Sequence, residues 1–128
     1  MSAPPYVPGR HVIEAYGAGG FRFAGMSHVG SILATPSGVG ALAAASLGEI
    51  DEAALAPLFA ELDAAPGAIE FLVIGAGAKL AAPPAAVQAR LRAAGLRFET
   101  MATGPAARVY NVLLDERRRA AALLIAVS

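Results

Sequence analysis

The sequence contains no cysteine and only two histidines, and its acidic and basic residues balance to a formal net charge of zero. Without cysteine the chain has no disulfide, no thiolate nucleophile and no cysteine-based metal site. His11 and His28 are far apart in the sequence and lack paired carboxylates, so we predict no metal site and no cofactor. A neutral chain has no general electrostatic attraction to phosphate backbones, so we expect no nucleic-acid partner.

Long hydrophobic runs are also missing. A transmembrane helix needs about 20 nearly uninterrupted apolar residues, and the longest runs here, residues 38–47 and 120–127, are much shorter. Residues 1–8 are rich in proline and have neither a basic start nor an apolar segment, so we predict no signal peptide. Although 56% of the residues are apolar, much of that excess is alanine. We therefore expect a soluble, cytoplasmic protein.

A single domain is expected from the length of 128 residues, because no linker, repeat or low-complexity stretch divides the chain. We predict a flexible tail over residues 1–10 and one α/β domain over residues 11–128. Within the first third, β-forming runs at residues 11–16, 21–23 and 29–34 are separated by glycine-rich turns. This pattern favours an N-terminal antiparallel meander.

After Glu49 the pattern changes to helices alternating with strands. Helices are predicted at residues 51–66, at 83–95, and from 103 into the arginines at 117–119. Strands are predicted at residues 69–74, 96–101 and 120–127. This order predicts a three-layer α/β domain in which helices cover a central mixed sheet. The expected core residues are Leu55, Leu58, Phe59, Leu62, Phe71, Val73, Val87, Leu91, Phe98, Val109, Val112, Leu113 and Leu124.

Glycines follow two of the predicted strands, where the carboxyl ends of parallel strands form the usual ligand crevice of an α/β sheet. We expect Gly77 and Gly104 to line one hollow that Arg108 faces, suited to a small anion or nucleotide. The spacing matches neither a dinucleotide fingerprint nor a P-loop. The candidate ligand-binding residues are Gly75, Gly77, Lys79, Thr103, Gly104, Arg108, Tyr110 and Asn111.

A structural interpretation of the same residues stays open. The glycines also serve a chain that leaves a buried strand and turns sharply, and Thr103 also suits the cap of a helix. The arginines at 117–119 are read as a helix end that complements the macrodipole, or as a contact for an acidic partner.

His28 lies close to two serines in the sequence, but the segment lacks an orienting acid and a strand-to-helix elbow, so we predict no catalytic residues. The interpretation for Arg22, His28 and Ser31 is a role in turns or at an interface.

Several short motifs, taken in order, carry a family resemblance. They are Ile13-Glu14-Ala15-Tyr16, Gly20-Phe21-Arg22-Phe23, His28-Val29-Gly30-Ser31, Val73-Ile74-Gly75-Ala76-Gly77, and Thr103-Gly104 with Tyr110-Asn111-Val112-Leu113. Together they resemble the small family that includes the mitochondrial NADH:ubiquinone oxidoreductase (complex I) assembly factor 3 and bacterial and archaeal single-domain proteins. The resemblance covers residues 11–127 and implies a three-layer α/β fold with a central mixed sheet. It also implies an assembly role and no established enzyme activity.

Two functions are therefore expected as alternatives. The first is a protein-interaction module, an assembly factor for a respiratory or membrane complex, with an unidentified protein partner through which the chain associates peripherally with a membrane. The second is a small anion- or nucleotide-binding protein that uses the glycine-rich strand ends, with enzyme activity left open.

Overall fold

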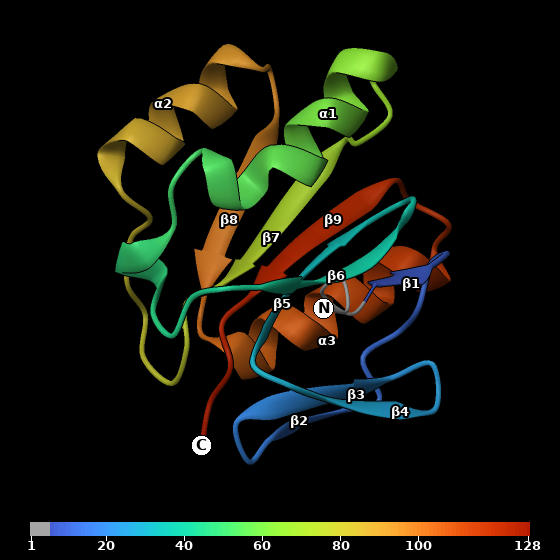
Figure 1. The fold of residues 1–128 in the computed structure, drawn as a ribbon. Coiled ribbons are helices and arrows are strands. Elements are labelled where there is room, and N and C mark those ends of the chain that lie inside the picture. Colours follow the sequence, from blue (N-terminus) through green and yellow to red (C-terminus); the bar gives the residue numbers. More distant parts are fainter. Residues whose placement is uncertain (1–5) are drawn as a thin grey trace, which may run out of the picture.

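Three layers make up the fold, as the computed structural model of residues 6–128 shows (Figure 1). Helices α1 (Ala56–Ala64) and α2 (Ala85–Ala93) cover one face of a six-stranded sheet. Helix α3 (Thr103–Asp115) and a separate three-stranded sheet lie on the other face. The predicted three-layer α/β fold with a central mixed sheet is confirmed. No helix within residues 6–128 has the length and apolar character needed to cross a membrane.

The central sheet has the strand order β1-β6-β5-β9-β7-β8. Its strands are β1 (Tyr6–Pro8), β5 (Ser31–Thr35), β6 (Gly38–Leu42), β7 (Phe71–Gly75), β8 (Arg97–Met101) and β9 (Ala120–Leu124). Strand β7 runs parallel to both β8 and β9, and the other pairs are antiparallel. The last strand of the chain is thus central and buried along its whole length, while β8 forms an edge, as the two sequence patterns predicted. The parallel strands end together at one side of the sheet.

The run predicted at residues 29–34 belongs to β5 of the central sheet, so the N-terminal meander differs from the predicted one in its third strand. The small sheet forms this meander. Its strands are β2 (Ala15–Gly17), β3 (Gly20–Phe23) and β4 (Met26–Val29), paired antiparallel in that order. Two-residue turns join them, and both residues of each turn have positive φ angles: 52° and 81° in the first turn, 52° and 72° in the second. This is the type I′ geometry that matches the twist of paired strands. The sequence analysis did not predict β4, β6 or the short strand β1, which lies within the expected tail over residues 1–10. Residues 1–5 of that expected tail lie outside the described residues.

Apolar side chains gather in two clusters, one on each face of the central sheet. Alternate residues of one strand feed both clusters, so that Leu72 and Ile74 face α1 and α2 whereas Val73 faces α3. Most of the predicted core residues belong to these clusters. Five of them are only half-buried: Leu62, Phe71, Phe98, Val109 and Leu113.

Helix α3 corrects two predictions. Its buried face consists of Thr103, Gly104, Ala106, Ala107 and Tyr110. These residues are mostly small, which lets the helix lie close to β7 and β9. Because each residue advances about 100° around a helix, this buried face turns Val112 outward, and its side chain is 55% exposed rather than part of the core. Thr103 is not the helix cap: the N-cap residue is Ala102, without a side-chain cap bond.

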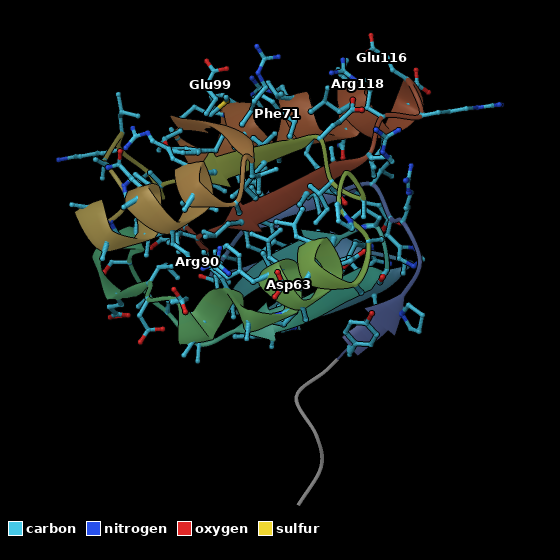
Figure 2. The ribbon with its side chains drawn as sticks, turned by 90° about the horizontal axis from the view of Figure 1, so that it is seen from above. Asp63, Phe71, Arg90, Glu99, Glu116 and Arg118 are labelled. Atoms are coloured by element: carbon cyan, nitrogen blue, oxygen red, sulfur yellow. The ribbon has the colours of Figure 1, made fainter. Side chains whose placement is uncertain are left out.

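Helices α1 and α2 are joined by Arg90 (Figure 2). Its guanidinium carbon lies 4.1 Å from the centroid of the Phe59 ring, and its Nε lies 3.3 Å from a carboxylate oxygen of Glu52. Two short 3₁₀ turns, Leu47–Glu49 and Ala53–Leu55, lead into α1. Oδ1 of Asp51 accepts a hydrogen bond of 2.8 Å from the amide of Ala54 in the second of these turns. Asp51 is the N-cap of neither element, because the N-cap residue is Glu52 for that turn and Leu55 for α1, both without a side-chain cap bond. The helix predicted over residues 51–66 therefore begins at Ala56 and not directly after Asp51.

The first turn of the small sheet offers a test of this local geometry. Ala18 adopts a φ of 52°, which strains an alanine but suits asparagine. We expect Ala18→Asn to raise the free energy of unfolding by about 0.5 to 1 kcal/mol, measured by denaturant titration. Ala18→Val, which is β-branched, should lower it. Equal stability for the three proteins would contradict the turn assignment.

Candidate functional site

The hollow predicted at the strand ends exists. It has a volume of about 350 Å³, and Gly77 and Gly104 both line it. The other lining residues are Tyr16, Ala78, Ala102, Pro105, Val127 and Ser128. The hollow thus combines the end of β7, the start of α3, the C-terminal segment and the small sheet. The sequence analysis did not predict the contributions of Tyr16 and of the C-terminal residues, because they depend on how the layers pack.

Thr103 lies beside this hollow and is fully buried. Its hydroxyl donates a hydrogen bond of 2.7 Å to the carbonyl of Ile125 and accepts one of 2.9 Å from the amide of Gly77. The amide of Thr103 in turn donates to the carbonyl of Gly77 at 2.8 Å. Both polar main-chain groups of Gly77 are therefore bonded within the protein, and its amide does not point at a ligand.

Close packing explains the glycines at positions 75 and 104. A Cβ atom added to Gly75 would lie 3.0 Å from the Cα atom of Thr103 and 2.9 Å from a methyl carbon of Leu124. A Cβ atom added to Gly104 would lie 2.9 Å from Cζ of Tyr16 and closer still to its hydroxyl oxygen. In both cases the added Cβ atom would lie closer to its neighbours than van der Waals contact allows. These glycines let α3 meet β7 and let the Tyr16 ring cover the first turn of α3.

The structure corrects the expected position of Arg108. Its side chain is exposed and does not line the hollow, because the buried face of α3 turns residue 108 outward together with residue 112. Lys79 is also exposed and outside the lining. Among the described residues, the lining of this hollow therefore contains no cation. An anion held there would depend on main-chain dipoles and hydroxyl groups alone.

Asn111 serves the fold. Its side-chain amide donates a bond of 2.9 Å to the carbonyl of Ile13, and its oxygen accepts one of 2.8 Å from the amide of the same residue. The side chain of Asn111 thereby gives the main chain of Ile13 the two hydrogen bonds that a neighbouring strand would otherwise provide. It holds the segment before β2 against α3.

Tyr110 is fully buried, and its hydroxyl has no hydrogen-bond partner among residues 6–128. Burial raises the pKa of the phenol to about 12, while the positive charge of Arg10 acts in the opposite direction. A buried hydroxyl without a partner costs free energy. Tyr110 is not among the residues that line the hollow, so it does not extend the candidate site.

The residues around His28 form no catalytic pair. Nε2 of His28 lies 3.3 Å from the carbonyl oxygen of Ser31 rather than from its hydroxyl. That hydroxyl donates to the carbonyl of Ala44 at 2.8 Å and accepts from the amide of Ala126 at 2.9 Å. Ser31 therefore ties β5 to the segments after β6 and β9.

Arg22 contacts the second turn of the small sheet, the strand β4 and the segment before β2. Its guanidinium lies 3.4 Å from a carboxylate oxygen of Glu14. It also donates to the hydroxyl of Ser27 at 3.2 Å and to the carbonyl of Gly25 at 3.3 Å. These contacts hold the meander together on its exposed side.

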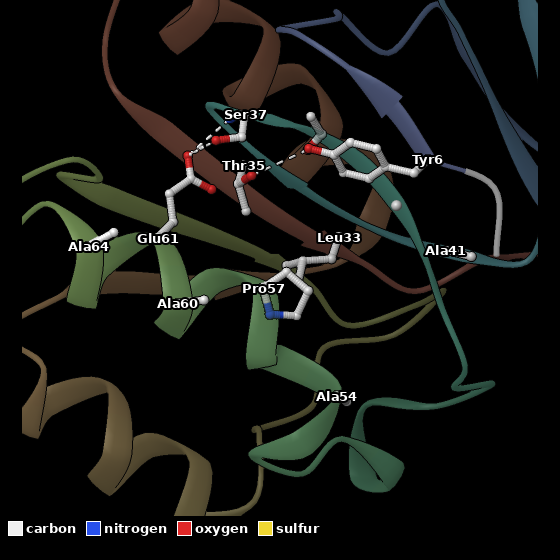
Figure 3. A pocket seen from close by; sticks show the side chains of 12 residues that line it. Tyr6, Leu33, Thr35, Ser37, Ala41, Ala54, Pro57, Ala60, Glu61 and Ala64 are labelled. Atoms are coloured by element: carbon white, nitrogen blue, oxygen red, sulfur yellow. Dashed lines mark hydrogen bonds between the residues drawn. The ribbon is translucent and has the colours of Figure 1, made fainter. Parts of the chain in front are cut away.

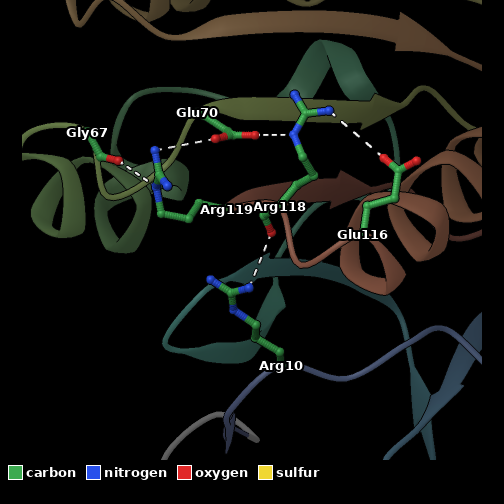
Figure 4. Close-up of polar contacts among 6 residues, drawn as sticks. All are labelled: Arg10, Gly67, Glu70, Glu116, Arg118 and Arg119. Atoms are coloured by element: carbon green, nitrogen blue, oxygen red, sulfur yellow. Dashed lines mark hydrogen bonds and ion pairs between the residues drawn. The ribbon is translucent and has the colours of Figure 1, made fainter.

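The arginines after α3 form an ion cluster (Figure 4). Arg118 is hydrogen-bonded to Glu70, and Nη2 of Arg119 lies 3.3 Å from the other carboxylate oxygen. Arg119 also donates to the carbonyl of Gly67 at 3.0 Å, and Arg10 donates to the carbonyl of Arg118 at 3.2 Å.

The hydrogen bond from Arg118 has the largest effect and lowers the pKa of Glu70; desolvation by burial opposes it, and the charges of Arg118 and Arg119 lower the pKa further. The same pairing raises the pKa of Arg118. Two of the three arginines thus connect the start of β9 to the start of β7. Residues 6–128 contain no group of three or more histidine, aspartate or glutamate side chains that could hold a metal ion.

Comparison with known proteins shows one family over most of the chain. The sequence model described as "Protein of unknown function (DUF498/DUF598)" matches residues 13–125. An uncharacterized protein of Rhodobacter capsulatus is 39% identical over 121 residues, which cover 94% of this chain and 89% of that protein.

Solved structures agree with the fold. A crystal structure described as an outer membrane protein from Bartonella henselae is 43% identical, with a TM-score of 0.86 and coverage of 94% of this chain and 98% of that one. A solution structure of a Bordetella pertussis protein, described as a Mth938-like domain, has a TM-score of 0.76 at 23% identity and covers 90% of this chain and 85% of its own. That second likeness supports the fold alone.

Thr103 provides a test of the structural interpretation. In Thr103→Val the buried amide of Gly77 and carbonyl of Ile125 lose their partner, so we expect the free energy of unfolding to fall by about 2 to 4 kcal/mol. Thr103→Ser keeps the hydroxyl and should lose only about 1 kcal/mol. Denaturant titration measures both. A valine variant as stable as the wild type would show that the hydroxyl serves something other than the fold.

Tyr110 provides a second test, through pH. Because its folded pKa of about 12 lies above the ordinary value of 10.0, the neutral phenol favours the folded state below pH 10, and this contribution is lost as the pH rises from 10 to 12. We expect Tyr110→Phe to remove that loss and to raise stability at neutral pH by about 1 kcal/mol, since the orphaned hydroxyl disappears.

Tyr16→Phe is the matched control for this substitution, because the Tyr16 side chain is 44% exposed. Its stability should follow that of the wild type at every pH. Ultraviolet absorbance titration should show one of the three tyrosines ionising only near pH 12 in the wild type and none doing so in Tyr110→Phe. Ionisation of all three tyrosines together would contradict the buried assignment.

Proposed function

The chain belongs to the DUF498/DUF598 family of unknown function, and from that premise we propose that it is a protein-interaction module that acts as an assembly factor for a respiratory or other membrane complex. One observation carries the proposal. The polar side chains that a ligand or catalytic site would need, above all Thr103, Asn111 and Ser31, are bonded to the protein's own main chain. Large apolar side chains, in contrast, remain on the surface.

The small sheet carries the exposed apolar side chains that best suit a partner. Val29 is 87% exposed, Met26 49% and Tyr16 44%. Val29 and Tyr16 also line a shallow hollow of about 400 Å³, together with Gly17 and Gly20. This sheet is the outermost layer on the α3 side of the molecule (Figure 1). Exposed apolar side chains that gather on one surface are typical of protein contact sites.

Two further points support a membrane complex as the partner of this protein. The Bartonella henselae relative is described as an outer membrane protein, and the sequence motifs resemble the family of the complex I assembly factor. We place the protein in the cytoplasm and assign the membrane association to its protein partner.

A second candidate function is the binding of a small anion or nucleotide at the strand ends. The observation in its favour is the shared hollow between Gly77 and Gly104, at the carboxyl ends of parallel strands. It is the weaker candidate, because Thr103 occupies both polar main-chain groups of Gly77 and the hollow has no cation in its described lining.

Affinity capture from membranes of the native host tests the first proposal. We expect the tagged wild-type chain to recover the subunits of one membrane complex in constant proportion. Val29→Lys should reduce that recovery at least tenfold, because it places a charge in the proposed contact surface. Leu80→Lys is the control, since Leu80 is 72% exposed but lies outside the small sheet. Recovery of no complex, or equal recovery by Val29→Lys, would contradict the proposal.

A further inference from the structure

An apolar groove lies on the other side of the central sheet, between α1 and the strands β1 and β6 (Figure 3). We call it the α1 groove. Its volume is about 380 Å³. One wall is the outer side of α1 with the turn before it, and the other is the edge of the sheet. The lining residues are Tyr6, Leu33, Thr35, Ser37, Gly38, Gly40, Ala41, Ala54, Pro57, Ala60, Glu61 and Ala64.

The groove exists because β6 lacks side chains where it faces α1. Gly38 and Gly40 lie on the same face of the strand, since side chains alternate between faces. A Cβ atom on Gly38 would lie 2.6 Å from the Tyr6 ring and from the carbonyl oxygen of Val7. The Tyr6 ring therefore lies against a glycine surface, and it is 55% exposed. Alternate glycines in a short β-forming run are the sequence signal that could have indicated this groove.

The wall formed by α1 is acidic. Residues 23–78 contain no lysine or arginine, and their acidic residues are Glu49, Asp51, Glu52, Glu61, Asp63 and Glu70. Glu52 pairs with Arg90 and Glu70 with the arginines after α3. Within residues 6–128, Asp51, Glu61 and Asp63 have no ion pair. Glu61 is the carboxylate in the lining of the groove, and no arginine or lysine within residues 6–128 pairs with it.

Glu61 lines the groove, and Asp51 lies next to the lining residue Ala54 at the other end of the α1 wall. At one end, Oε1 of Glu61 accepts bonds of 3.0 Å and 2.7 Å from the amide and hydroxyl of Ser37, which closes the groove (Figure 3). At the other end, Asp51 is bonded to the amide of Ala54. From residue 54 to residue 64 the helical chain rises about 15 Å. An extended segment of about five residues covers that length.

We propose that the α1 groove binds an extended apolar segment of a partner protein, about five residues long, with a lysine or arginine at each end. The apolar side chains of the segment pack against Pro57, Ala60 and the Tyr6 ring. Its basic ends meet Glu61 and Asp51. The inference rests on the proposed function and adds a second contact surface, on the opposite face of the sheet from Val29.

Two defined peptides of equal length test the charge preference of the groove. One probe has five leucine and valine residues between two pairs of lysines, and the matched probe has glutamates in place of the lysines. Fluorescence anisotropy with the full chain should give at least tenfold tighter binding for the lysine peptide. That preference should weaken as salt is added, because surface charges are screened. Equal binding of the two peptides, or none of either, would overturn the proposal.

Substitutions in the α1 groove test whether the peptide binds there. Ala60→Trp fills the groove and should weaken binding of the lysine peptide more than tenfold. Glu61→Gln keeps an acceptor for Ser37 but removes the charge, so it should weaken binding several-fold and reduce the salt dependence. Ala93→Trp, on an exposed part of α2, and Glu99→Gln, on the exposed part of β8, are the controls and should bind as the wild type does. Circular dichroism checks that every variant is folded.

Four outcomes decide between this inference and the proposed function. If Ala60→Trp binds the lysine peptide as tightly as the wild type, the groove is not the site. If Ala60→Trp converts a dimer to a monomer on gel filtration, the occupant is a second copy of this chain and the proposal is overturned. If the wild type and Ala60→Trp both recover the same membrane complex, the groove proposal fails while the interaction function stands. Failure of the wild type to recover any complex counts against the interaction function itself.

Discussion

The hydroxyl of Thr103 is the interaction on which the arrangement of the parallel strands depends. It joins the end of β7 to the end of β9 through Gly77 and Ile125, at the point where α3 begins. Such a joint has no access to water, so every polar group in it must find its partner within the protein. The lack of a side chain at Gly75 completes the joint, because any Cβ atom there would meet Thr103. The position of α3 over the sheet follows from these contacts.

This joint also decides what the strand ends can do. In many α/β proteins the amides at this edge bind a ligand, but here the polar groups of Gly77 bond to Thr103. Tyr16 then covers the first turn of α3. Among residues 6–128, no cation lines the hollow that remains. The proposed contact surfaces are therefore on the outside of the molecule: the exposed apolar residues of the small sheet on one side, and the α1 groove on the other.

Local patterns in the sequence predicted much of the fold. The uniformly apolar run at residues 120–127 indicated a central strand, and β9 is central. The alternating run at residues 96–101 indicated an edge, and β8 is an edge. In α3 the pattern was misread, because Val112 has the apolar character of a core residue while Gly104 and Ala106 do not look like one. The helix buries its small residues instead, since small residues allow the closest approach to the sheet.

The sequence by itself determined the fold class, the meander and most helices and strands, because these depend on periodicity and turn residues within short segments. It also indicated that Gly77 and Gly104 meet, because both follow strands of a parallel pair. Only the tertiary structure decided what those residues do. Hydrogen bonds such as those of Thr103 with Ile125, and of Asn111 with Ile13, join residues far apart in the chain. No local pattern records such partners. The alternate glycines of β6 are a local signal for the α1 groove, but its walls come together only when β1 pairs with β6.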